Sequence, residues 1–267
     1  MKHFFAAIVV LCLTACATAT GVDEPFVVPE QLSIESGSRI GILSVAANEL
    51  DQDRIGFMVF GNKSEIFDIS DWNLDEEWKA QIESVLPSIA QFEIVDLSVD
   101  PANVVALYPS RDKFFYGGKR FNYKDTVSEF SRIARQNDLD ALIVAASAVY
   151  DPQRAGMIYE GPSIVTNYGP RGFQTIYLLT LELALIDGTS GELINAEIAR
   201  VGSRWTEPYD AVPYQEAGDD LDDVWFSDYA AEDKAMLRQA FASMPDDAWL
   251  RSLSKVLEDK KASRNAD

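Results

Sequence analysis

The sequence predicts an α/β fold, with an α+β arrangement as the alternative. Short apolar, β-branched runs typical of buried strands recur along the chain, and amphipathic stretches of helical period lie between them. A long apolar stretch in the second half of the chain then turns back on itself. We expect a mixed sheet of about five strands flanked by two helices, with a long C-terminal hairpin and an acidic helical C-terminal extension.

The first half of the chain supplies strand and helix patterns in alternation. Residues 39–47 (RIGILSVAA) form an apolar run of buried-strand type, and residues 54–70 predict a hairpin that turns at Gly61 and Asn62. Residues 73–91 predict a helix, because acidic side chains occupy its first turn and one face is apolar. That face consists of Trp78, Ile82, Val85, Leu86 and Ile89.

Two further strands and a second helix follow. Residues 92–98 and 141–150 have the composition of strands. Between them, residues 125–138 predict a helix that opens with the capping box Thr126-x-x-Glu129. Its inward face is expected to consist of Val127, Phe130 and Ala134.

The long hairpin is predicted at residues 174–201, with the turn sequence DGTSG. Its first strand presents one apolar face, made of Tyr177, Leu179, Leu181, Leu183 and Leu185. From Asp219 onward the chain is acidic and predicts two helices. Each has Pro or Asp near its start and Lys or Arg near its end, as the helix dipole favours.

The N-terminal residues indicate export. A positive start at residues 1–3 precedes an apolar run at residues 4–13, which is shorter than the ~20 residues that a membrane-spanning helix needs. The sequence LTAC at residues 13–16 resembles the bacterial lipobox, which implies that Cys16 is lipidated and becomes the mature N-terminus. The alternative is an ordinary cysteine beside a conventional cleavage site.

The residues after Cys16 favour the outer membrane, because Ala17 and Thr18 stand where an Asp would act as an inner-membrane retention signal. We expect a lipid-anchored protein of the outer membrane that faces the periplasm. The expected organisation is a signal peptide at 1–15, a flexible tether at 16–38, an α/β domain at 39–205, and an acidic loop with C-terminal helices at 206–267.

Composition excludes several kinds of chemistry. The only histidine is His3 and the only cysteines are Cys12 and Cys16, so the mature chain lacks the groups that a Ser-His-Asp hydrolase, a Cys-His protease or a His-bearing zinc site requires. The net charge of −20 argues against nucleic-acid binding. We expect no metal, no cofactor and no enzymatic activity; the alternative is a carboxylate-dependent enzyme that acts on envelope glycan.

Four segments together resemble a known family: RIGILSVA at 39–46, FEIVDL at 92–97, LDALIVAASA at 139–148 and LELALIDGTSGELI at 181–194. They are similar to the anticodon-binding-domain-like α/β lipoproteins of the bacterial envelope. Relatives include the curli secretion-channel lipoprotein, the lipoprotein activators of penicillin-binding proteins and the N-terminal domain of the Tol-Pal propeller protein. The resemblance implies a fold and a cell-envelope setting, and it carries over no particular activity.

The candidate binding loop is the segment at residues 111–124 (RDKFFYGGKRFNYK). It combines five basic and five aromatic residues in an otherwise acidic chain. The residues expected to make contact are Phe115, Tyr116, Lys119, Arg120 and Phe121. The alternative is that the aromatic residues close one end of the core and the cations pair with neighbouring acids.

Two other segments are weaker candidates. The glycines of residues 151–174 do not have the spacing of a phosphate-binding loop, so a mobile or hairpin-shaped contact loop is expected there. The acidic run at residues 219–223 lacks the ligand spacing of a calcium loop and is expected to be a solvated helix start.

The predicted function is binding, as an assembly or accessory factor of the periplasm whose partner is an envelope protein or glycan. Cys16 is expected to attach the protein to the membrane. The alternative to both binding and enzymatic roles is a subunit of a pore or secretion assembly, in which the hairpin at residues 54–70 would take part. The oligomeric state is left open.

Overall fold

The structure is a computed structural model of the chain. It describes residues 29, 31–55, 62–97, 99, 103, 123–150, 159–169, 172–199, 214–216 and 224–259. The first half of this part contains β1 (Arg39–Ser44), β2 (Glu49–Ile55), β3 (Lys63–Asp68), η2 (Ser70–Trp72), α2 (Leu74–Val85), η3 (Leu86–Ser88), β4 (Glu93–Val95) and α4 (Tyr123–Gln136). The second half contains β5 (Ala141–Ser147), β6 (Val149–Tyr150), β7 (Tyr159–Gly169), β8 (Gly172–Asp187), β9 (Leu193–Ile198), β10 (Tyr214–Glu216), η5 (Phe226–Asp228), α5 (Ala231–Ser243) and α6 (Asp246–Leu257).

The strands form one mixed sheet, which confirms the predicted α/β class. Across the part of the chain that is described, its main path runs β3-β2-β7-β8-β5-β1-β4, with β6 paired to β7 and with β9 and β10 paired to β8. The pairs β1–β4, β1–β5 and β2–β7 are parallel, and the other pairs are antiparallel. The described residues form ten strands, more than the about five that the sequence predicts, because β2, β3 and β7 add a second half to the sheet and β6 and β10 are short additional strands.

Strand β8 joins the two halves of the sheet. Along its first half it pairs with β7, from Gly172 to Thr180, and along its second half it pairs with β5, from Leu181 to Asp187. Its odd-numbered side chains lie in the main core, and this face was predicted correctly; they are Tyr177, Leu179, Leu181, Leu183 and Leu185.

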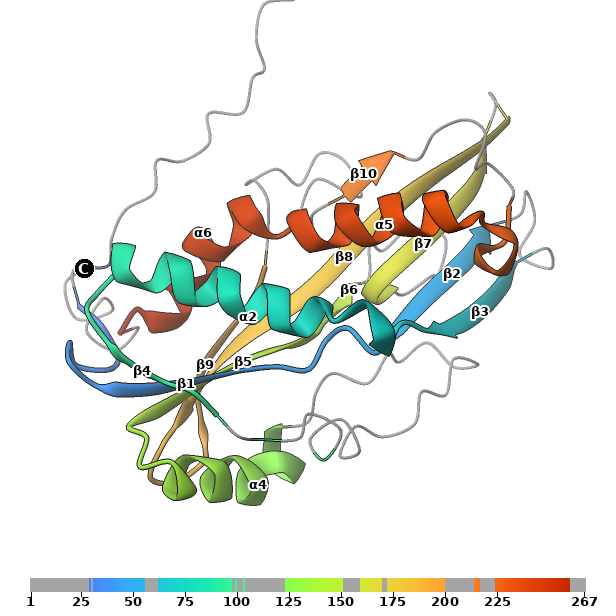
Figure 1. The fold of residues 1–267 in the computed structure, drawn as a ribbon. Coiled ribbons are helices and arrows are strands. Elements are labelled where there is room, and N and C mark those ends of the chain that lie inside the picture. The colour runs from blue at the N-terminus through green and yellow to red at the C-terminus, as the bar shows by residue number, and fades with distance from the viewer. Residues whose placement is uncertain are drawn as a thin grey trace, which may run out of the picture.

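Helices cover both faces of the sheet. Figure 1 shows α2, α5 and α6 across one face and α4 on the other. The main core lies beneath the first three helices and contains the buried side chains of Trp78, Phe241 and Trp249. A second core lies beneath α4, where Phe130 and Ile133 pack against Leu142 and Val144 of β5. Alternate residues of each strand face opposite cores, as the period of a strand requires.

The predicted helices agree with the structure except at their ends. On α2, Trp78 and Ile82 are buried as predicted and Val85 is half-buried; Leu86 and Ile89, which follow the helix, are also buried as predicted. The helix ends at Val85, and Pro87 lies in the 3₁₀ turn η3 that follows. Helix α4 begins at Tyr123, before Thr126, and the Glu129 carboxylate accepts a hydrogen bond from Arg132 (2.8 Å), so the predicted capping box is wrong.

Two predicted segments differ from the structure: the hairpin at residues 54–70 and the loop at residues 151–174. The first strand of the hairpin predicted at residues 54–70 begins at Glu49, because the buried residues Leu50 and Gln52 continue the strand through charged neighbours. Its predicted turn at Gly61 falls outside the described residues. Most of the loop predicted at 151–174 instead belongs to the antiparallel strands β7 and β8. Of the two predicted forms, mobile or hairpin-shaped, the structure has the hairpin.

The turn DGTSG connects β8 to β9 as predicted. The Asp187 Oδ1 atom accepts hydrogen bonds from the backbone amides of Thr189 (3.0 Å) and Ser190 (2.6 Å), which closes the turn. Gly191 has a positive φ of 75°, a conformation that glycine adopts without strain. At Gly188 a Cβ atom would lie 2.1 Å from the Leu139 carbonyl oxygen, so only glycine fits there.

Arg39, the first residue of β1, forms hydrogen bonds to β4 and to the residues just after α4. Its Nε atom donates to the carbonyl of Asp138 (2.7 Å) and its Nη2 atom to that of Asn137 (3.2 Å), so the cation lies at the C-terminal end of α4. Its Nη1 atom donates to Glu93 of β4 (2.5 Å). The order of β4, β1 and α4 is thereby fixed at one end of the sheet.

Candidate functional site

The residues that the sequence singles out lie outside the described part of the chain. This holds for the lipidation residue Cys16 and for the acidic run at residues 219–223. It also holds for the candidate binding residues Phe115, Tyr116, Lys119, Arg120 and Phe121. Their roles stay predictions.

Within the described residues, aromatic side chains gather between α5 and the strands β2, β3 and β8. We call this group the aromatic cluster; it consists of Phe67, Trp72, Tyr177, Phe226, Tyr229 and Phe241. The ring centroids of Phe67 and Phe226 lie 5.0 Å apart, and those of Trp72 and Phe226 lie 5.7 Å apart in an edge-on arrangement. Such tilted and edge-on pairs are the favoured geometries for aromatic rings.

Two cations lie over aromatic rings beside this cluster. The guanidinium carbon of Arg54 is 4.2 Å from the ring centroid of Trp225, and the Nζ atom of Lys234 is 4.9 Å from that of Phe226. Both distances are within the range of cation–π attraction, which contributes ~0.5–2 kcal/mol per pair. Two cations are thus held at the edge of an aromatic surface in a protein of net charge −20.

The cluster has a buried floor and a partly exposed rim. Phe241 is fully buried and Phe226 and Tyr229 are nearly so. By contrast, Phe67, Trp72 and Trp225 are half-buried. We call these last three residues, with Arg54 and Lys234, the aromatic rim. Aromatic side chains and arginine at a surface are the residue types that most often dominate the energy of protein interfaces.

Gln52 of β2 holds the chain segment that carries Trp225. The side chain of Gln52 is fully buried, and its Nε2 atom donates to the carbonyl of Val224 (2.8 Å). Its Oε1 atom accepts from the backbone amide of Phe226 (2.7 Å). One side-chain amide therefore satisfies the backbone groups on both sides of Trp225 and fixes this segment on the sheet.

The hydroxyl of Tyr229 is not suited to act as a base. Burial, and next the repulsion from Tyr177, raise the pKa of Tyr229 above its ordinary value. The hydroxyl therefore stays protonated at neutral pH. The chemistry of the cluster is that of apolar, cation–π and hydrogen-bond contacts, which suits binding.

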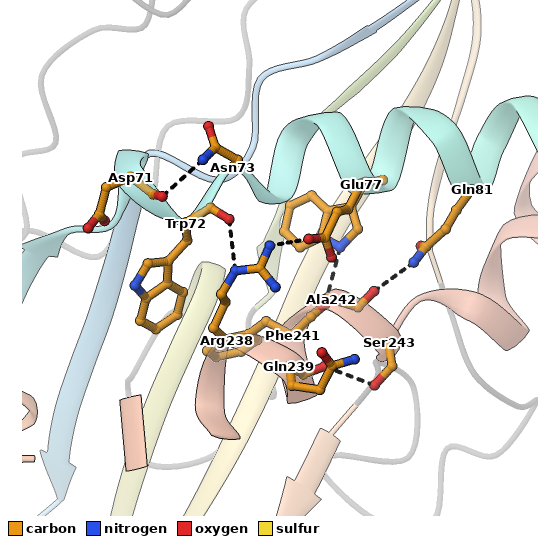
Figure 2. A network of polar contacts seen from close by, with 11 residues as sticks. Asp71, Trp72, Asn73, Glu77, Gln81, Arg238, Gln239, Phe241, Ala242 and Ser243 are labelled. Atoms are coloured by element: carbon orange, nitrogen blue, oxygen red, sulfur yellow. Dashed lines mark hydrogen bonds and ion pairs between the residues drawn. The ribbon is translucent and has the colours of Figure 1, made fainter. Parts of the chain in front are cut away.

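A polar network between α2 and α5 includes two residues of the aromatic cluster, Trp72 and Phe241 (Figure 2). Arg238 of α5 donates to the carbonyl of Trp72 (3.0 Å) and forms an ion pair with Glu77. Across the same interface, Trp78 and Gln81 of α2 donate to the carbonyls of Phe241 (3.2 Å) and Ala242 (2.8 Å).

This network satisfies backbone groups that a helix end leaves without partners. The carbonyls of the last turn of α5 have no partner within the helix, and the side chains of α2 supply one. Trp249 of α6 then donates to the Oε1 atom of Gln81 (2.8 Å), so the three helices form one hydrogen-bonded layer. The network is therefore a structural support for the rim rather than a reactive site.

The Asp75 carboxylate, in the first turn of α2, accepts hydrogen bonds from the segment at the end of β1. It accepts from the hydroxyl of Ser44 (2.6 Å) and from the amides of Ala46 (2.9 Å) and Ala47 (3.3 Å). Burial raises the pKa of Asp75 above its ordinary value. These three bonds attach the loop after β1 to the first turn of α2, which is a structural role.

The described residues hold no group of three or more His, Cys, Asp or Glu side chains placed to bind a metal ion. In the same ranges, none of the helices is long and apolar enough to cross a membrane.

The sequence gives only a weak signal for the aromatic rim. Trp225 and Phe226 stand side by side after the acidic run, in a segment predicted simply as helix. Phe67 lies in the predicted hairpin, and Trp72 lies in the turn after it. Their meeting depends on long-range strand pairing and on the docking of α5, neither of which has a local pattern.

Comparisons with known proteins give distant structural likenesses. No protein-family model and no curated protein matches the sequence. Among solved structures, the PelC dodecamer from Paraburkholderia phytofirmans is 10% identical and aligns 85% of this chain with 93% of that chain at a TM-score of 0.29. The LpoB C-terminal domain from Salmonella enterica is 12% identical and aligns 64% of this chain with 87% of that one at a TM-score of 0.25.

A lipoprotein from Neisseria meningitidis, GNA1162, is 10% identical and aligns 76% of this chain with 94% of its own at a TM-score of 0.31. At these identities and TM-scores, the comparisons assign neither a family nor a function to this chain.

Proposed function

We propose that this protein is a lipid-anchored component of the bacterial cell envelope that works by binding, as an assembly or accessory factor in the periplasm. The location rests on the LTAC sequence at residues 13–16, directly after an apolar run of signal-peptide length. Cys16 would carry the lipid and hold the protein on the outer membrane.

The observation that carries the binding role is the aromatic rim beside the edge strand β3. This strand lies at one end of the main path of the sheet, and its residues are exposed except for the half-buried Phe67. Ile66 on this strand leaves 43% of its surface in water. An edge strand beside half-exposed aromatic side chains offers a partner both backbone hydrogen bonds and apolar contact.

The candidate loop at residues 111–124 is the second contact element that we propose. Its residues Phe115, Tyr116, Lys119 and Arg120 combine the same two residue types as the rim, aromatic and cationic. Replacing all four by Ser tests this role. If they face solvent, each change alters the free energy of unfolding by no more than ~0.5 kcal/mol, and capture of the partner falls while the domain stays folded.

The opposite result assigns the loop to the core. Buried aromatic rings cost ~3–5 kcal/mol each when they are deleted, and a domain has only about 5–15 kcal/mol of stability. The four-residue variant would then lose its cooperative thermal transition. A single thermal melt separates the two outcomes.

The binding role is tested by pulling down partners from detergent-solubilised envelopes with the lipidated protein. The Ile66→Asp variant places a charge on the edge strand, and Ser84→Asp, at an exposed position of α2, is the matched control. We expect Ile66→Asp to lose partners that the wild type and Ser84→Asp retain. Equal recovery with all three proteins would contradict binding at this edge.

A further inference from the structure

Two cations lie directly opposite each other at the start of the edge strand β3. Arg54 of β2 and Lys63 of β3 are partners in the register of this antiparallel pair, so their side chains extend from the same face of the sheet. Like charges placed directly opposite each other weaken the pairing of two strands. The arrangement therefore costs stability, and it concentrates positive charge at one end of the sheet edge.

This pair lies on the face of the sheet that carries the aromatic rim. Alternate residues of a strand share a face, so Lys63, Glu65 and Phe67 extend from the same side of β3. Phe67 belongs to the aromatic cluster on that side, and the guanidinium carbon of Arg54 lies 4.2 Å from the ring centroid of Trp225. The edge of the rim thus presents, in order along β3, a cation, an acid and an aromatic ring.

Lys63 has no acidic partner within the described part of the chain. Its side chain is exposed, and none of the ion pairs that the described residues form among themselves includes it. Glu65 lies two positions along the same face, but no ion pair joins it to Lys63. By contrast, Lys79 and Lys255 pair with the carboxylates of Asp96 and Glu197. The ammonium group of Lys63 can therefore meet an acid of another molecule.

The backbone of β3 sets where such an acid would lie. β3 is at one end of the main path of the described sheet, so a segment from another molecule can add to it as the next strand. Side chains directly opposite each other on neighbouring strands have their Cβ atoms ~5 Å apart. A carboxylate opposite Lys63 would thus be within reach of its ammonium group, and Arg54, one strand farther from the edge, would add to the attraction.

We propose that the partner of β3 is an extended segment of an envelope protein that places a carboxylate opposite Lys63, beside Arg54. The proposal rests on the binding role of β3 that the proposed function includes, and it adds the chemistry of the partner. Backbone hydrogen bonds along β3 hold the segment, and an Asp or Glu at this one position sets its register. A basic residue there would add a third like charge to the two cations.

The net charge of the protein opposes this preference. A chain of charge −20 repels an acidic peptide and attracts a basic one at long range. An opposite-charge pair across two strands strengthens their pairing by about 1.5- to 5-fold. A preference for the acidic segment therefore requires the local cations at the edge, because the overall charge of the protein would produce the reverse order.

The experiment uses two peptides that differ in one residue. Both are acetylated and amidated; one has the sequence Thr-Val-Thr-Glu-Thr-Val-Thr, and the other has Lys in place of Glu. The full-length protein, in nonionic detergent, carries a benzophenone amino acid at Ile66 of β3, or at the exposed Ser84 of α2 as the control for location. The peptide concentration that gives half-maximal crosslinking is measured by mass spectrometry.

Two charge-reversed variants test the role of Lys63. Lys63→Glu replaces a like-charge pair with Arg54 by an opposite-charge pair, so the fold should not be destabilised. Arg135→Glu is the matched control, because Arg135 is an exposed cation of α4, on the other face of the sheet (Figure 1). Both variants carry the benzophenone at position 66 and have the same change in net charge.

We expect the Glu peptide to reach half-maximal crosslinking at a concentration at least about twofold lower than the Lys peptide. This order should reverse in Lys63→Glu, persist in Arg135→Glu, and disappear in about 1 M salt, where the Debye length is ~3 Å. Equal crosslinking of the two peptides from position 66, or tighter binding of the Lys peptide, overturns the carboxylate contact and leaves binding at β3 intact. If position 66 crosslinks neither peptide more than position 84 does, binding at this edge is overturned as well.

Discussion

Gln52 provides the sharpest test of how the aromatic rim is held. Its buried side-chain amide bonds to the carbonyl of Val224 and to the amide of Phe226, at 2.8 and 2.7 Å. The substitution Gln52→Met keeps the length and nearly the volume of the side chain but removes both hydrogen bonds. Any decrease in the free energy of unfolding then measures the cost of leaving these two backbone groups without partners.

The expected loss follows from the burial of these two groups. A buried donor or acceptor that loses its partner costs ~1–3 kcal/mol. Phe226 is only 6% exposed, so its amide bears the full cost, whereas the half-buried Val224 leaves its carbonyl some access to water. We therefore expect a destabilisation of about 2–4 kcal/mol, a large part of the about 5–15 kcal/mol that a domain has.

Urea unfolding, followed by far-ultraviolet circular dichroism, measures this change from the midpoint and slope of the transition. Gln91→Met is the matched control, because the side chain of Gln91 is exposed, and it should alter the free energy of unfolding by no more than ~0.5 kcal/mol. If Gln52→Met is as stable as this control, the two hydrogen bonds do not hold the segment of Trp225 and the reasoning is refuted.

Three other predictions concern the anchor and the hairpin turn. Cys16→Ala should abolish palmitate labelling and release the protein from the membrane, and retained labelling would contradict acylation. The amide of Ser190 lowers the pKa of Asp187, so this carboxylate stabilises the fold above its unfolded pKa of about 3.9 and loses that effect as the pH falls through its folded pKa. Asp187→Asn should therefore be less stable than the wild type at pH 7 and equal to it in strong acid; a difference independent of pH in urea titrations would speak against this. Gly188→Ala should lower stability by about 2–4 kcal/mol, because its Cβ would lie 2.1 Å from the Leu139 carbonyl oxygen, and an unchanged melting temperature would refute the close approach.

The elements with a strong local pattern could be predicted from the sequence. Strand β5 is a continuous apolar run, and α2 has one apolar face of helical period, so each forms where it is expected. The DGTSG turn is specified by its own residues, since Asp187 accepts the amides within it and Gly191 takes the positive φ.

The second half of the sheet could not be predicted in this way. Four of the seven residues of strand β2 (ELDQDRI) are charged, and the residues from Leu50 to Asp53 are all buried, so no apolar alternation marks it as a strand. β7 includes Gly161 and Pro162, which are typical of loops, and it pairs in parallel with β2 across more than a hundred intervening positions. Such pairing has no local signal, because register is set by contacts between distant segments.

The aromatic rim was missed for the same reason. Arg54, Phe67 and Trp225 come from three separate segments, and they meet only after β2 pairs with β3 and Gln52 fixes the segment of Trp225. Composition did point to a combination of aromatic and cationic side chains, but in the segment at residues 111–124, which lies outside the described residues.

Photo-crosslinking in living cells tests the central claim, binding by a lipid-anchored envelope protein, most directly. A benzophenone amino acid is placed at Ile66, on the exposed edge strand, and in a control protein at Ser84 of α2. The account predicts a discrete crosslinked partner from position 66 that is absent from position 84 and is lost when Cys16→Ala removes the protein from the membrane. Identical crosslinking from both positions, or a partner captured equally well without the anchor, would contradict it.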